Sequence, residues 1–237
     1  MKIANFSFSS TLERLYPGFE NVSSRICFQE DCLVCAMMRR MSMRMRIFAA
    51  LAAWACLATA SAEPLRVLVT AHSQTGNTMA LAEALAEGAR DVEGVEATVK
   101  SVAEVSRADL EAADAIALGS PVHMGDAAAE VRAALVRWSG DFGFWESRGL
   151  ENKVGAVFAT GALPSNGKEL TMMSLATGLL QFGVVLVSPY GSLGASATTY
   201  KPDPGVDEAE KKVARDLGRR LAEVAGRMKR GAGAAAP

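Results

Sequence analysis

The most informative segment of this chain reads Ser73-Gln74-Thr75-Gly76-Asn77-Thr78. It follows an apolar run at residues 65–70 that is typical of a buried strand, and it leads into a helical pattern of apolar residues at 77–90. The first backbone N–H groups of a helix have no intrahelical partner, and the helix dipole places partial positive charge there. A strand, a polar loop and a helix start therefore predict an anion-binding site.

The chemistry of this loop favours a phosphate monoester. Gly76 permits close approach of the backbone to a ligand, and the hydroxyl and amide side chains around it are neutral hydrogen-bond donors. The loop contains neither Lys nor Arg, whereas a P-loop for a nucleoside triphosphate carries a lysine. A simple helix N-cap is the alternative interpretation, but a cap needs one hydroxyl and not this succession of small polar residues.

The loop resembles the FMN-phosphate loop of flavodoxin-like proteins, which has the pattern T/S-x-T-G-N-T after the first strand. Two later segments resemble loops of the NAD(P)H:quinone oxidoreductase branch of that superfamily. They are Gly119-Ser120-Pro121-Val122-His123-Met124-Gly125-Asp126, and Phe158-Ala159-Thr160-Gly161 with the loop that continues to Gly167. The resemblance covers residues 65–228, which is nearly all of the part expected to fold.

The resemblance implies FMN as the cofactor and implies no metal. The FMN phosphate would be bound by Ser73, Gln74, Thr75, Gly76, Asn77 and Thr78. The flavin ring would lie between the other two loops, beside Pro121, Val122, His123, Met124, Gly125, Thr160, Gly161 and Gly167.

The sequence contains two histidines, His72 and His123, and each lies at or in a loop that the resemblance assigns to the flavin. A histidine there would hold charge beside the reduced flavin or exchange a proton with a quinone. We predict this catalytic role for His123, whose loop would follow the edge of the ring. For His72 two interpretations stay open: a role at the ring, or a loop donor that points away from the ligand.

Departures from the family pattern bear on the substrate. The loop at 119–126 lacks the aromatic residue that electron-transfer flavodoxins stack on the ring, which leaves a ring face open and favours an enzyme. Trp138, Phe142, Phe144 and Trp145 would approach the ring from the connection at 139–150, although core or surface packing is the favoured interpretation for Trp138 and Phe142. Gln181 stands where some quinone reductase relatives carry histidine, which argues against quinone as the specific acceptor.

Residues 39–62 have the features of a secretory signal peptide. Arg39, Arg40, Arg44 and Arg46 precede an apolar stretch at 47–60, and Ala60-Ser61-Ala62 then forms a cleavage site. This pattern predicts export to the periplasm with cleavage after Ala62; an uncleaved anchor is disfavoured because a spanning helix needs about 20 apolar residues. Residues 1–38 are interpreted as a non-functional N-terminal extension or a misassigned start.

Apolar runs at 65–70, 95–99, 115–118, 154–159 and 184–187 alternate with helical patterns at 77–90, 127–138, 170–181 and 207–228. Such alternation predicts parallel strands connected by right-handed crossover helices. We expect one α/β domain over 63–230, a flavodoxin-like three-layer sandwich with a five-stranded parallel sheet and helices on both faces. The segment at 188–206 is expected to be a long functional or mobile loop, and 231–237 a disordered tail.

Charge and motifs together define the expected function. The formal net charge is −1 and no basic cluster indicates a nucleic-acid partner. We expect an exported FMN-dependent oxidoreductase that is NAD(P)H-dependent or quinone-linked and transfers two electrons, with a homodimer or a higher oligomer as the candidate assemblies. The alternatives are a periplasmic flavodoxin-type carrier of single electrons that works with a redox protein, and an interaction module of the same fold without the cofactor.

Overall fold

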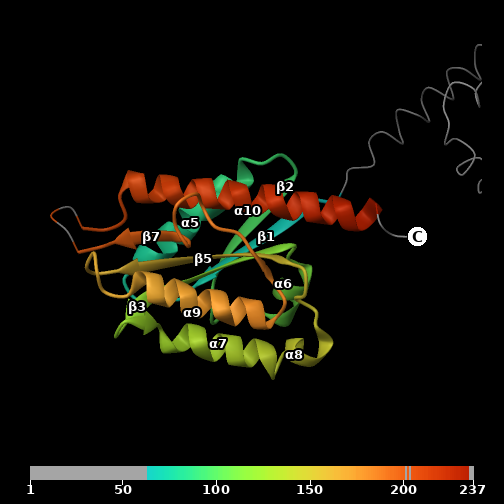
Figure 1. Cartoon of the computed structure of the whole chain (residues 1–237), viewed down its shortest axis with the longest axis horizontal. Helices are drawn as coiled ribbons and strands as arrows, with labels where there is room; N and C mark the ends of the chain where they lie inside the picture. The colour runs from blue at the N-terminus through green and yellow to red at the C-terminus, as the bar shows by residue number, and fades with distance from the viewer. Residues whose placement is uncertain (1–62, 201, 203, 235–237) are drawn as a thin grey trace, which may run out of the picture. The chain divides into compact units, whose positions relative to one another are not determined.

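The computed structural model describes residues 63–200, 202 and 204–234, in which strands and helices alternate (Figure 1). The strands are β1 (Leu65–Ala71), β2 (Val95–Ser101), β3 (Ala115–His123), β4 (Asp126–Ala127), β5 (Val154–Gly161), β6 (Val185–Leu186) and β7 (Ala195–Thr198). The helices are α5 (Asn77–Arg90), α6 (Arg107–Ala112), α7 (Ala129–Ser139), α8 (Phe144–Ser147), α9 (Lys168–Gln181) and α10 (Glu208–Ala234). The predicted N-terminal extension and signal peptide lie outside the described residues.

The strands form a mainly parallel sheet in the order β2-β1-β3-β5-β6. β1 pairs with β2 on one side and β3 on the other, and β5 pairs with β3. This is the predicted flavodoxin-like order, and the switch point lies between β1 and β3, where the direction of winding reverses. Every residue of β5 is buried, which explains the continuous apolar run that identified this strand in the sequence.

Helices cover both faces of the sheet, which confirms the three-layer architecture (Figure 1). α5 and α10 pack on one face in a core that contains Val69, Ala117 and Phe158. α6, α7, α8 and α9 supply the core of the other face, which contains Leu68 and Ile116. Successive side chains of a strand point to opposite faces, so neighbours such as Leu68 and Val69 enter different cores.

The fifth strand of the expected sheet is divided, which corrects the prediction of one loop over 188–206. β6 pairs with the start of β5, and β7 pairs with its end, opposite Phe158 to Gly161. Between them the chain leaves the sheet at Pro189, which has no N–H to donate, and turns at Gly191, whose φ is +80°. The predicted loop therefore contains a short edge strand, and a two-residue strand, β4, adds an antiparallel hairpin to β3.

Helix α10 continues to Ala234, so the prediction that 231–237 is disordered is wrong for residues 231–234. Alanine has the highest helix propensity, and the end of the helix is held to the sheet. The Lys229 ammonium donates to Asp114 Oδ2 at 2.8 Å and to Pro64 O at 3.3 Å. Among the residues that the structure describes, no helix is long and apolar enough to cross a membrane.

Helices α5 and α10 cross closely because glycines lie at their contact. A Cβ placed on Gly88 would lie 1.9 Å from Arg215 O, and one on Gly218 would lie 1.9 Å from Leu85 O. Real side chains do not approach backbone atoms at this distance, so either substitution forces the helices apart. The two glycines thus fix how deeply α10 packs against α5 over the sheet.

We predict that Gly218→Ala lowers the free energy of unfolding by about 1–3 kcal/mol, the usual cost of overpacking. Helix propensity alone would change stability the other way, by about 1 kcal/mol in favour of alanine. Gly231→Ala in the same helix is the matched control, because a Cβ there meets nothing within 4 Å. Urea unfolding of both variants measures the difference, and an unchanged or stabilised Gly218→Ala protein would contradict the close crossing.

A complete capping box begins α6. Asp109 N–H donates to Ser106 Oγ at 3.2 Å, and Ser106 N–H donates to Asp109 Oδ2 at 2.9 Å. The Lys100 ammonium of β2 donates to Asp109 Oδ1 at 2.6 Å. The Lys100 bond, followed by those from Ser106, lowers the pKa of Asp109 from 3.8 to about 2. The carboxylate therefore stabilises the fold above the pKa of an unfolded aspartate, and this contribution is lost as the pH falls toward 2.

We predict that Asp109→Asn lowers the free energy of unfolding at pH 7 by about 1 kcal/mol, after allowance for solvent screening of a partly exposed pair. The difference from the unsubstituted protein should shrink as the pH is lowered from about 4 to 2. Glu111→Gln removes a carboxylate from the same helix whose ion pair with Arg107 is half-exposed. Urea unfolding at several pH values should show a smaller loss for that control; equal losses would contradict the special role of Asp109.

Candidate functional site

Three loops meet at one edge of the sheet because β1, β3 and β5 are parallel neighbours. The loop after β1 touches the end of β5, where the hydroxyls of Thr78 and Thr160 are 2.7 Å apart. The loop after β3 touches the loop after β5, since a Cβ on Gly167 would lie 2.6 Å from Gly125 O. The predicted site residues, which are scattered along the chain, are thus brought to one place at the carboxyl ends of the strands.

The first loop ends in a helix start that has no side-chain cap. Gly76 is the N-cap residue of α5, with φ +86°, and no side chain bonds to the first N–H groups of the helix. The first intrahelical bond runs from Ala80 N–H to Gly76 O at 2.9 Å. The first turn contains no acidic residue, and the Asn77 amide donates to Thr75 Oγ1 at 3.1 Å instead of capping. The backbone N–H groups before Ala80 are therefore left for a ligand.

Ser73 adds an unpartnered hydroxyl to this loop: its Oγ is buried and makes no hydrogen bond. Gln74, Thr75 and Gly76 are exposed, whereas the Thr78 hydroxyl is buried and bonds to Thr160. Two of the predicted phosphate and ring residues thus bond to each other and hold the loop against β5. These features fit a phosphate group that is bound by neutral donors. They are the α5 start without a side-chain cap, the unpartnered Ser73 hydroxyl, and Gly76, which has no side chain.

The second loop is a tight turn between β3 and β4. Pro121, Val122 and His123 end β3, and all three are partly exposed. The turn residues Met124 and Gly125 both have positive φ, +51° and +87°. Methionine rarely adopts this conformation, and here its side chain is fully exposed. The strained backbone thus presents a flexible apolar side chain at the edge of the site.

The third loop, after β5, begins at Thr160 and Gly161 and ends at Gly167, whose φ is +101°. A Cβ on Gly161 would lie 2.3 Å from the Asn166 amide, which closes the loop. In the orientation that satisfies both of its groups, that amide donates to Leu163 O at 3.0 Å and accepts from Ala162 N–H at 3.1 Å. The loop therefore has a defined shape, and α9 starts after it without a side-chain cap.

Two residues of the site edge were not predicted from the sequence. Lys168 is only 5% exposed, and its ammonium donates to Thr198 Oγ1 at 2.5 Å and to Leu163 O at 3.4 Å. Tyr200 N–H donates to Ala162 O at 3.0 Å, while the tyrosine ring is exposed. Both contacts involve β7 or the residues just after it, and β7 lies within the segment at 188–206 that was expected to be a loop. The sequence signal that could have indicated this part of the site was Tyr200 itself, a tyrosine in a segment rich in Gly, Thr and Pro.

The four aromatic residues considered for the ring site lie elsewhere in this chain, and packing in or against the core, the interpretation favoured for Trp138 and Phe142, is confirmed. Helix α7 starts at the edge with the loops and runs back along the sheet, so the connection at 139–150 lies at the opposite edge (Figure 1). Trp138 and Phe144 are buried in the core there, Phe142 packs against that core, and Trp145 is exposed. None of these four side chains reaches the loops of its own chain.

The two histidines meet at the site. Their ring centroids are 6.2 Å apart, and the rings are nearly perpendicular. His72 Nε2 is buried without a hydrogen bond, 3.6 Å from Glu130 Oε1 of α7. His72 therefore packs against His123, the residue predicted to be catalytic, and its Nε2 lies beside Glu130.

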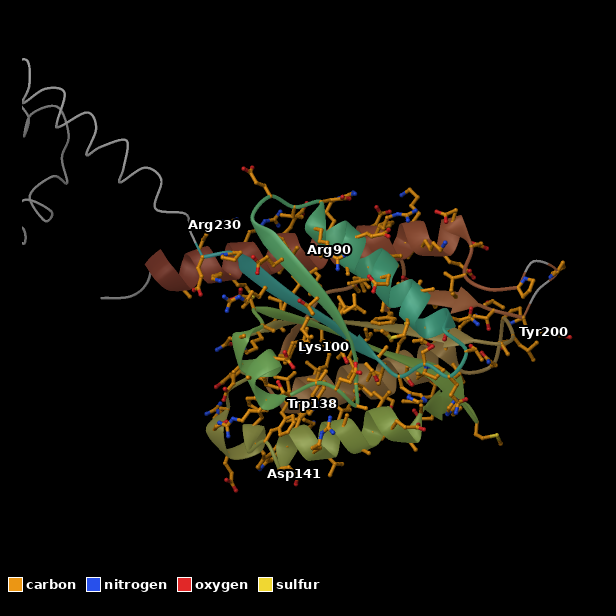
Figure 2. The ribbon with its side chains drawn as sticks, turned by 180° about the vertical axis from the view of Figure 1, so that it is seen from behind. Arg90, Lys100, Trp138, Asp141, Tyr200 and Arg230 are labelled. Carbon is orange, nitrogen blue, oxygen red and sulfur yellow. The ribbon has the colours of Figure 1, made fainter. Side chains whose placement is uncertain are left out.

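A groove of about 480 Å³ lies far from these loops, between β1, β2 and the end of α10. Its lining includes Leu65, Val95, Ala222 and Arg230 and none of the predicted site residues. Figure 2 shows Arg230 and Tyr200 at opposite ends of the domain, near the groove and near the loops respectively. We place the functional site at the loops because orphan polar groups gather there, and parallel sheets bind ligands at the carboxyl ends of their strands.

Comparisons with known proteins cover the folded part of this chain. The Flavodoxin family matches residues 69–200. An NAD(P)H dehydrogenase (quinone) of Archaeoglobus fulgidus is 34% identical over 196 residues, which cover 69% of this chain and 98% of that protein. A flavodoxin of Aquifex aeolicus is 34% identical over 163 residues, which cover 67% of this chain and 85% of that protein. The crystal structure of the flavodoxin, WrbA-like protein from Agrobacterium tumefaciens shares 29% identity with a TM-score of 0.60, covering 69% of this chain and 99% of that one.

Proposed function

The chain belongs to the flavodoxin family, and from this premise we propose that it is an FMN-dependent oxidoreductase that transfers two electrons from NAD(P)H to a quinone. FMN is the cofactor of this family. The observation that carries the proposal is the meeting of three loops around an uncapped helix start, in a chain that spans 98% of a relative named for this activity.

The residues present fit FMN. The phosphate would be bound by the backbone N–H groups at the start of α5 and by the orphan Ser73 hydroxyl. The ring would lie between the β3–β4 turn and the loop after β5, where the absence of a side chain at Gly167 allows its backbone to approach that of Gly125. When bound, FMN supplies hydride transfer at its ring, and the protein's part is to bind, orient and tune it.

His123 is the residue to which we assign proton transfer. It ends β3, its side chain is partly exposed, and it lies in a turn at the edge of the ring site. An imidazole there can give a proton to a quinone that has accepted a hydride. The turn presents Met124 in place of a stacked aromatic ring, so an aromatic substrate can approach one face of the flavin.

A single-electron carrier is the second candidate. Its support is the flavodoxin of Aquifex aeolicus, which is as similar to this chain in identity as the quinone reductase of Archaeoglobus fulgidus. The exposed ring of Tyr200 beside the loop after β5 also favours it, because an aromatic side chain that covers the flavin would exclude a second substrate. This candidate requires a redox protein as partner in place of NAD(P)H.

Export is part of the proposal. It is supported by the arginines, the short apolar stretch and the Ala60-Ser61-Ala62 site that precede the folded domain. Removal of this segment would leave a chain that starts at Glu63, two residues before β1. The proposed location is the periplasm.

We predict that Gly76→Val raises the dissociation constant for FMN at least ~100-fold. Valine is strained by about 1–3 kcal/mol at a φ of +86°, and relief of that strain would turn the N–H groups of α5 away from the phosphate. Gly94→Val is the matched control: its φ is +75°, a Cβ there also meets open space, and it precedes β2 at the other edge of the sheet. Quenching of FMN fluorescence measures both, and retained FMN binding by Gly76→Val would contradict the phosphate-loop assignment.

We predict that NADPH, added without oxygen to the FMN-loaded protein, bleaches the flavin by two electrons without a radical absorption band. Absorption spectra follow the titration, and a screen of quinones then identifies the acceptor. Bound flavin that ignores NADPH, yet forms a radical with a chemical reductant, would overturn the reductase and leave the single-electron carrier.

A further inference from the structure

Lys168 is the one charged residue that is almost completely buried in the part of the chain that the structure describes. It is the first residue of α9 and directly follows the loop after β5. Its ammonium donates to Thr198 Oγ1 of β7 at 2.5 Å and to Leu163 O of the loop at 3.4 Å. A buried charge is costly unless other charges compensate it, so its position at the site edge needs a physical reason.

The protein compensates this charge only in part. Both oxygens that accept from the Lys168 ammonium are neutral, and the carboxylate of Glu210 is reached at one remove, because Thr198 N–H donates to Glu210 Oε1 at 2.7 Å. The start of α9 has no side-chain cap, so the positive end of its dipole adds to the ammonium. Glu169 lies in the same helical turn, but it is exposed and therefore screened by solvent. An anion beside the loop after β5 would complete the compensation.

We propose that Lys168 is a fixed positive charge that stabilises the reduced flavin across the loop after β5. This inference rests on the proposed function, because it requires the FMN ring to lie beside that loop. Since Lys168 is buried against the loop, it would tune the flavin without touching the ring, and it is not a catalytic residue in this scheme.

The charge balance of flavin reduction supplies the anion. The oxidised ring is neutral, and a hydride brings two electrons and one proton, so the ring gains one negative charge until a second proton arrives from solvent. A nearby positive charge shielded from water stabilises that negative charge. The protein then binds reduced FMN more tightly relative to oxidised FMN, which raises the two-electron potential and makes hydride transfer from NAD(P)H more favourable.

The first test is the midpoint potential of bound FMN in Lys168→Gln, whose amide can still donate to Thr198 and Leu163 but has no charge. Titration with a chemical reductant without oxygen gives the potential, and FMN fluorescence gives the dissociation constant of the oxidised form. We expect the affinity for reduced relative to oxidised FMN to fall about tenfold, which lowers the two-electron potential by about 30 mV.

Lys153→Gln is the matched control. The Lys153 ammonium also donates to backbone carbonyls, those of Glu111 and Ala113, and its removal changes the net charge equally. Lys153 precedes β5, however, at the edge of the sheet opposite the loops. Equal falls in potential in the two variants would overturn the local role of Lys168.

Lys168→Met separates the charge from the shape of the loop, because it removes the hydrogen bonds as well. The charge role predicts the same fall in potential as in Lys168→Gln, with any further loss of affinity shared by both forms of FMN. A residue that only shapes the loop would weaken both forms by the same factor and leave the potential unchanged. That result, or a Lys168→Gln protein that binds neither form, would overturn the proposal.

These measurements need neither NADPH nor a quinone, so the two proposals can fail separately. A potential that depends on Lys168, in a protein that ignores NADPH, would keep the tuning role and refute the reductase. A protein that NADPH reduces, with the same potential in Lys168→Gln, would keep the reductase and refute the tuning role.

Discussion

The parallel pairing of β1, β3 and β5 brings the carboxyl ends of three buried strands to one edge of the sheet, and each candidate loop begins there. Parallel neighbours need crossover helices, so each of these strands is followed by a helix that starts beside the strand's end, and the chain after β3 first forms the short hairpin with β4. Two of those helix starts, at Gly76 and Gly167, have a positive φ and no side-chain cap. The site is therefore a direct consequence of the sheet topology.

The helix starts of the described residues are satisfied in different ways: α6 and α10 have side-chain caps, whereas α5, α7, α8 and α9 have none. Ser106 and Asp109 form a complete capping box for α6, and Asp207 and Glu210 exchange the same two bonds at α10. α5, by contrast, begins in a loop of capable side chains that do not cap it. Capping residues are available and unused at α5, and the buried Ser73 hydroxyl beside it has no partner, which fits an anion bound at this helix start.

Local patterns in the sequence were sufficient to predict the sheet order and most elements. The central strands are apolar throughout, and α5 ends at Arg90, where its predicted helical pattern ends. Local patterns were insufficient where burial comes from partners distant in sequence. β7 is a short run of Ala, Ser and Thr, and it is a strand because it pairs with β5. The same reason hid the buried Lys168 and the contact between His72 and His123, since neither leaves a periodic signal. Phe144 and Trp145 were considered for the ring site but lie at the opposite edge, because the direction of α7 follows from the topology and not from composition.

The choice between a reductase and a single-electron carrier is a question of which side chain covers the flavin. A carrier needs only edge access and gains from an aromatic ring on the flavin face, whereas a hydride-transferring enzyme must leave that face open to a second planar molecule. In this chain the β3–β4 turn offers Met124, a flexible side chain that stands in solvent on a strained backbone and can move aside at little cost. Tyr200 N–H donates to Ala162 O of the loop after β5, and its ring is exposed. An exposed Met124 in place of a stacked aromatic ring thus favours the proposed reductase, whereas an exposed tyrosine ring beside the loop after β5 favours the carrier.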